Sequence, residues 1–150
     1  MEIPISALMT KLIWAVNSED TIDKVDRFLT LHKLSAAPVV DQAGALFGII
    51  SSHDLLHFFS TKRNPRAVRA WELCTYRPTS VGPDTPVSAV AGKMLENKIH
   101  HLLIVEDGKL IGIVSALDFV RQCIPELAKG GEIEHQELVT PRYPTDYEIW

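Results

Sequence analysis

Gly48-Ile49-Ile50-Ser51-Ser52-His53-Asp54 returns 64 residues later as Gly112-Ile113-Val114-Ser115-Ala116-Leu117-Asp118, and this repeated stretch decides the fold. Each copy is an apolar run followed by a serine and, three residues on, an aspartate. The pattern predicts a strand that leads directly into a helix. Because repetition at a fixed period marks a duplicated structural unit, we expect the chain to fold as two copies of one unit.

Further segments return at an offset of 65 residues. Leu8-Met9-Thr10 corresponds to Leu73-Cys74-Thr75, and Pro38-Val39-Val40 corresponds to Leu103-Ile104-Val105. A unit of about 60 residues buries little apolar surface by itself, so the two copies are expected to pack together.

The 150-residue chain therefore divides into a first repeat over residues 3–60, a linker over 61–67, a second repeat over 68–125 and a tail over 126–150. The tail has six acidic and two basic side chains, so it holds the whole net charge of −4. Its composition predicts a loosely ordered segment. The other residues balance their charges and offer no basic face for nucleic acid.

The composition, 46% hydrophobic and 23% charged, is typical of a soluble globular protein. No apolar stretch approaches the length of a membrane span, and the first residues do not resemble a secretory signal. Cys74 and Cys123 are too few for a disulfide framework, and His53 and His57 lack a third metal ligand. We expect a cytoplasmic protein with no metal, no membrane contact and no nucleic-acid partner.

Each copy is predicted to form a short strand, a helix, a hairpin of two strands and a second helix. Thr21 and Thr85 are expected N-caps of the first helices, with Pro86 as the first helical residue in the second copy. Pro125 is expected to end the last helix.

The turn after each repeated strand is a candidate anion site, because a helix N-terminus presents free backbone N–H groups and a partial positive charge. Ser51 and Ser115 add a hydroxyl donor there, and Asp54 and Asp118 can accept both hydrogens of a ribose diol. The same Ser-x-x-Asp pattern is also a helix capping box, and the residues alone leave both interpretations open.

These features together resemble a tandem pair of CBS domains, the adenosyl-sensing unit called a Bateman module. The resemblance rests on the repeat openers Leu8-Met9-Thr10 and Leu73-Cys74-Thr75, on the central strands, and on the two Gly-x-x-Ser-x-x-Asp segments. It implies an α/β fold with two β-α-β-β-α repeats packed with pseudo-twofold symmetry and two clefts between them. In the family these clefts often hold adenosine nucleotides or related adenosyl compounds. The resemblance assigns the serines and aspartates above the same ligand contacts.

The resemblance also places a histidine toward the ligand phosphate at the start of the central strand. His100 and His101 stand there, and strand alternation lets only one of them face the cleft easily, with His101 favoured. The first copy has Ala36 and Ala37 at that place. The two clefts are therefore expected to be unequal, and the cleft with the histidines is expected to bind more strongly.

The first strand of each copy, over Ile13–Val16 and Pro78–Val81, is expected to wall an adenine base. Four of these residues are the candidates for contact: Trp14, Val16, Thr79 and Val81. Trp14 either stacks on the base, blocks the cleft or packs in the core.

No catalytic residue is assigned, because no nucleophile–base pair, glycine elbow or Walker motif is present. We interpret the chain as a stand-alone regulatory module, not an enzyme, which binds an adenosyl ligand and modulates a separate, unknown partner protein. AMP, ADP or ATP is favoured over S-adenosylmethionine or NAD, and no cofactor is required.

A homodimer is expected, with apolar surface supplied by the closing helices over Leu55–Phe59 and Phe119–Cys123. Two alternatives stay open. One is a dimerisation scaffold with empty or occluded clefts, and the other is an uncharacterised enzyme that uses a cleft.

Overall fold

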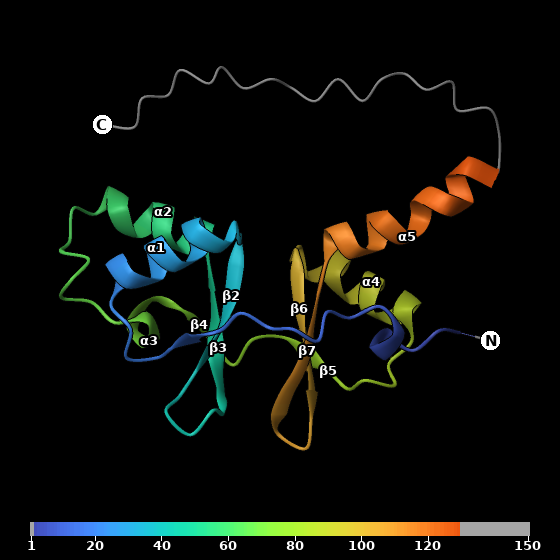
Figure 1. Cartoon of the computed structure of the whole chain (residues 1–150), viewed down its shortest axis with the longest axis horizontal. Helices are drawn as coiled ribbons and strands as arrows, with labels where there is room; N and C mark the ends of the chain where they lie inside the picture. The colour runs from blue at the N-terminus through green and yellow to red at the C-terminus, as the bar shows by residue number, and fades with distance from the viewer. Residues whose placement is uncertain (1, 130–150) are drawn as a thin grey trace.

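Both copies fold in the order that their apolar runs predict. The computed structural model describes residues 2–129, which form two sheets flanked by helices (Figure 1). The first repeat contains β1 (Val16–Asn17), α1 (Ile22–His32), β2 (Ala36–Val40), β3 (Leu46–Ser51) and α2 (Ser52–Ser60). The second contains β5 (Ser80–Val81), α4 (Val87–Asn97), β6 (His101–Glu106), β7 (Lys109–Ser115) and α5 (Ala116–Lys129). The predicted α/β fold of two β-α-β-β-α repeats is confirmed.

The two sheets have the same topology. In each, a short first strand lies parallel to the central strand, which forms an antiparallel hairpin with the next one. Gly44 and Gly108, with φ values of 82° and 76°, occupy the left-handed positions of the two hairpin turns. Each sheet buries its own apolar cluster, centred on Val39 and Ile50 in the first repeat and on Ile104 and Val114 in the second.

The segment that opens each repeat packs against the other repeat. Before the first repeat, the 3-10 helix η1 (Ile5–Ala7) places Ile5 in the core of the second repeat, where Met9 also packs. Before the second repeat, α3 (Ala70–Leu73) contributes Ala70 to the core of the first, and β4 (Thr75–Tyr76) adds a fourth strand beside β3. The exchange joins the two copies, since neither core is complete without a segment from the other half of the chain.

This exchange explains why the second helix begins later than predicted. Pro86 is the N-cap of α4 with extended backbone, and the helix starts at Val87. The reason is a bridge between Pro4 and Pro86, in which the N–H of Ile5 donates to the carbonyl of Thr85. The equivalent bridge in the first repeat joins Thr21 to the segment before α3, and Thr21 is the N-cap as predicted.

Two other expected boundaries are wrong. The first strands are shorter than Ile13–Val16 and Pro78–Val81, because only two residues of β1 and two of β5 pair with a central strand. Helix α5 continues through Pro125 to Lys129. A proline removes one helical N–H, and the carbonyl left free belongs to the exposed residue Arg121, where water can reach it. Most of the predicted tail, residues 130–150, lies outside the described residues.

No helix within residues 2–129 combines the length and the apolar character that a membrane crossing requires.

Two glycines of the repeated stretch permit the exchanged segments to approach the sheets. A Cβ atom at Gly48 would lie 2.4 Å from the carbonyl oxygen of Thr75 and 2.8 Å from Sγ of Cys74. A Cβ atom at Gly112 would lie 2.3 Å from Sδ of Met9, which occupies the equivalent place in the other repeat. Both glycines are thus required by close packing between the halves of the chain.

We expect Gly48→Ala to lower the free energy of unfolding by about 1–3 kcal/mol, because the obstacle includes backbone that cannot move aside. Gly112→Ala should cost less, since the nearest atoms belong to the flexible Met9 side chain. Gly92, inside α4 with open space around it, is the control, and Gly92→Ala should stabilise the protein by about 0.5–1 kcal/mol. Chemical denaturation measures all three, and an undiminished stability of Gly48→Ala would contradict the packing argument.

Candidate functional site

A cleft of about 470 Å³ lies between the two repeats. This volume lies within the roughly 300–1,000 Å³ of small-molecule sites. The first repeat and its opening segment line one side with Thr10, Leu12, Ile13, Trp14, Lys33, Leu34, Ser35, Ala36 and Pro38. The second repeat lines the other side with His101, Ile113, Ser115, Leu117, Asp118 and Arg121.

The cleft brings together four of the residues that the sequence predicted, namely Trp14, His101, Ser115 and Asp118. Six others lie outside it: Val16, Ser51, Asp54, Thr79, Val81 and His100. Val16 was expected to wall the base, but it is buried in the core of the first repeat. Val81 packs against the core of the second repeat for the same reason, since both belong to the short paired strands.

Asp118 combines a capping contact with a free carboxylate oxygen. Its Oδ2 accepts hydrogen bonds from the backbone N–H of Ser115 at 2.7 Å and from the Ser115 hydroxyl at 3.1 Å. Its Oδ1 lies 3.9 Å from a guanidinium nitrogen of Arg121. Because the cap uses one oxygen and a carboxylate has two, capping and ligand binding do not exclude each other.

Asp54 makes the same cap in the first repeat. Its Oδ2 accepts from the Ser51 backbone N–H at 2.8 Å, and its own N–H donates to the Ser51 hydroxyl at 3.2 Å, which completes a capping box. The capping interpretation is therefore confirmed for Ser51 and Asp54. These residues provide an internal control, because they share the local geometry of Ser115 and Asp118 but do not line the cleft.

His101 is the first residue of β6 and reaches the first repeat. It pairs with Ser115 on β7, as Ala36 pairs with Ser51 in the other sheet. This register makes Ala36 the equivalent of His101 and Ser35 the equivalent of His100, so the predicted equivalence of the alanines and histidines was wrong by one residue. The Nε2 atom of His101 lies 3.3 Å from the Ser35 hydroxyl, which joins the two walls of the cleft.

The surroundings of His101 favour its neutral form. Burial is the main cause that lowers the pKa of His101, and the nearby His100 lowers it further, against the opposing charge of Asp118. A phosphate placed beside the ring would reverse this preference by attracting a proton.

Two basic residues at the cleft were not found from the sequence. Lys33 follows α1 in a left-handed conformation, and Arg121 lies one helical turn after Asp118. The repeat contained one signal, since Lys98 ends α4 in the same conformation as Lys33. With Asp118, the lining has two basic groups and one acidic group, so it suits a ligand with negative charge.

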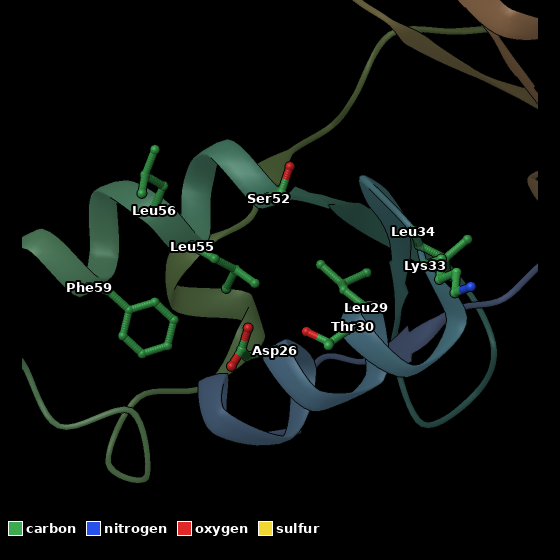
Figure 2. A pocket seen from close by; sticks show the side chains of 9 residues that line it. All are labelled: Asp26, Leu29, Thr30, Lys33, Leu34, Ser52, Leu55, Leu56 and Phe59. Carbon is green, nitrogen blue, oxygen red and sulfur yellow. The ribbon is translucent and has the colours of Figure 1, made fainter. Parts of the chain in front are cut away.

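A second hollow lies within the first repeat, between α1 and α2 (Figure 2). Its lining is mainly apolar and includes Leu29, Leu55, Leu56 and Phe59. It lacks the convergent polar groups of the cleft between the repeats, so it fits a packing surface better than a nucleotide site.

Within residues 2–129, no group of three or more histidine, cysteine or acidic side chains is arranged to hold a metal ion.

We expect the free energy of unfolding to fall as the pH decreases from about 7.5 to about 5, because the unfolded chain protonates His101 near its ordinary pKa of about 6.5 while the folded cleft resists the proton. His101→Gln should flatten this dependence. His57→Gln, at an exposed position of α2, is the matched control and should keep it. An unchanged slope in His101→Gln, measured by urea unfolding across this range, would show that burial does not perturb the ring.

Comparisons with known proteins agree with this geometry. The sequence model of the CBS domain matches residues 5–61 and 70–124. Inosine-5'-monophosphate dehydrogenase of Mycobacterium bovis is 31% identical over 105 residues, which are 69% of this chain and 19% of the enzyme.

Two solved structures with bound adenosyl compounds have the same fold. One is CBSX2 in complex with AMP, with a TM-score of 0.72 and 27% identity over 83% of this chain and 98% of that one. The other is the CBS domain pair of protein MJ0100 in complex with 5'-methylthioadenosine and S-adenosyl-L-methionine, with a TM-score of 0.76 and 25% identity over 84% and 99%. This chain belongs to the CBS domain family and contains two CBS domains in tandem.

Proposed function

We propose that the cleft between the repeats binds an adenosine nucleotide, AMP, ADP or ATP, and that its occupancy regulates a partner protein. One observation carries the proposal: Asp118 caps α5 with one carboxylate oxygen and keeps the other for the cleft. That oxygen can accept hydrogen bonds from a ribose diol, the contact by which acidic residues read ribose in dinucleotide-binding folds. The AMP and S-adenosylmethionine complexes of similar CBS pairs support an adenosyl ligand.

The charged groups favour a nucleotide over S-adenosylmethionine. Lys33 and Arg121 approach the cleft from different repeats, and His101 lies between them in the lining. A phosphate can accept hydrogen bonds from these groups, and Arg121 can exchange its long contact with Asp118 for a phosphate oxygen. S-adenosylmethionine places a positive sulfonium where AMP has its phosphate, so the two basic groups would repel it.

Binding at this site would act on both repeats at once. The lining comes from both, and the Ser35–His101 contact already joins them. A ligand that contacts the two sides differently in two arrangements of the repeats shifts the population between them. The matched part of the much longer inosine-5'-monophosphate dehydrogenase shows that this type of unit also occurs in a chain with an enzyme activity. We therefore propose a regulatory role, with the partner and the absence of catalysis both open to test.

The Asp118 proposal is tested by comparing two cap deletions. Asp118→Ala should weaken AMP binding by about 1–3 kcal/mol, the scale of a lost hydrogen bond to a charged group. Asp54→Ala removes the equivalent cap outside the cleft and should leave the affinity of the main site unchanged. Asp118→Asn preserves capping and separates the loss of charge from helix fraying. Calorimetric titration with AMP and adenosine measures each, and equal affinities for wild type and Asp118→Ala would reduce Asp118 to a cap.

We also propose that the module forms a homodimer through its helices. Leu56 on α2 is 71% exposed and Leu95 on α4 is 79% exposed. Exposed apolar side chains on α5 continue this surface, at Leu117, Val120 and Ile124. The hollow between α1 and α2 offers a place for side chains of a second copy (Figure 2). Exposed apolar surface of this kind marks interaction sites.

Leu56→Glu and Val120→Glu should convert the dimer to a monomer, because each would bury an unpaired carboxylate in the apolar contact. Leu12→Glu is the control, since Leu12 is 89% exposed at the cleft and not on these helices. Sedimentation equilibrium at micromolar concentration distinguishes the outcomes. A monomeric wild-type chain, with and without AMP, would remove the homodimer proposal.

A further inference from the structure

An aromatic cluster stands beside the cleft in the first repeat. The ring of Trp14 stacks on His32 with centroids 4.0 Å apart and planes 21° apart. Phe28 meets both rings edge-on, at 6.2 Å from Trp14 and 4.7 Å from His32. Phe28 and His32 are four residues apart on α1, so they lie on one face of that helix. The cluster holds the indole in a defined orientation just before β1.

Trp14 alone of the three lines the cleft. It is 54% exposed, although one face of its ring is covered by His32. The ring surface that His32 leaves uncovered is therefore available on the cleft side. A large aromatic side chain fixed from behind and open in front has the form of a stacking platform.

The shared fold does not require this cluster. At an offset of 65 residues, the second repeat has Thr79, Lys93 and Asn97 where the first has Trp14, Phe28 and His32. The second repeat nevertheless forms the same helix and the same short strand. The aromatic rings are therefore a particular property of the cleft that Trp14 lines.

We infer that Trp14 is the platform on which the ligand's planar heteroaromatic base stacks, and that His32 is a positioning residue that holds the indole for it. This inference rests on the proposed function and adds to it the part of the ligand that each side of the cleft contacts. The neighbouring lining residues Leu12, Ile13 and Pro38 carry no polar side-chain groups, so stacking is the main interaction that side chains can offer a base there.

The test measures AMP affinity and tryptophan fluorescence in a Trp71→Phe, Trp150→Phe background, in which Trp14 is the remaining tryptophan. AMP should quench Trp14 fluorescence, and Trp14→Ala should weaken AMP binding about 10- to 100-fold, as expected for loss of a base–aromatic stack. Trp14→Phe should retain most of the affinity. Ribose 5-phosphate, which has no base, should bind equally well to wild type and Trp14→Ala.

The role of His32 is tested by truncation and rescue. His32→Ala should weaken AMP binding about threefold and reduce the quenching, and His32→Phe should restore both, because a phenyl ring can support the indole equally well. His57→Ala is the matched control on an exposed helix face. Thermal unfolding should be nearly unchanged in all three, which separates positioning from stability.

The outcomes distinguish the two proposals. If wild-type protein binds neither AMP, ATP nor S-adenosylmethionine, the proposed function is overturned and this inference with it. If AMP binds wild type and Trp14→Ala with equal affinity, or leaves Trp14 fluorescence unchanged, the stacking inference alone is overturned.

Discussion

The structure depends on the exchange of opening segments between the two repeats. Each segment inserts apolar side chains into the core of the other repeat and pairs with its last strand, at Thr10 with Ile113 and at Thr75 with Ile49. The glycine before each paired isoleucine is the residue that allows this approach, because a side chain there would overlap the incoming segment. A single repeat of this size has too small a core, and the exchange provides the missing burial without enlarging either copy.

The same crossing builds the cleft. Once Thr10 has paired beside the last strand of the second repeat, the chain must return to its own sheet, which it enters at Val16. The residues of this return path include Leu12 and Trp14, and they line the cleft opposite Asp118. The ligand site is thus a consequence of the connection between the repeats, and stability and binding share the same few residues.

Symmetry of the backbone does not produce symmetry of chemistry. Asp54 and Asp118 make closely similar caps, because the same turn needs the same backbone N–H groups satisfied. Only the cleft with Asp118 is also lined by His101 and has the supported ring of Trp14. A duplicated fold can therefore keep its architecture while one of its sites acquires charge and aromatic surface that the other lacks.

The sequence by itself determined the duplicated α/β architecture and the helix start at each Ser-x-x-Asp segment, because periodic apolar runs and capping residues act over a few neighbours in the chain. It also predicted Ser115, Asp118 and His101 as lining residues. The contact of Ser35 with His101 joins residues 66 positions apart, and the pairing of Trp14 with His32 has no periodic signal. Only the tertiary structure decided these contacts, along with the exclusion of Val16 from the cleft, because they depend on how segments distant in the chain are packed together.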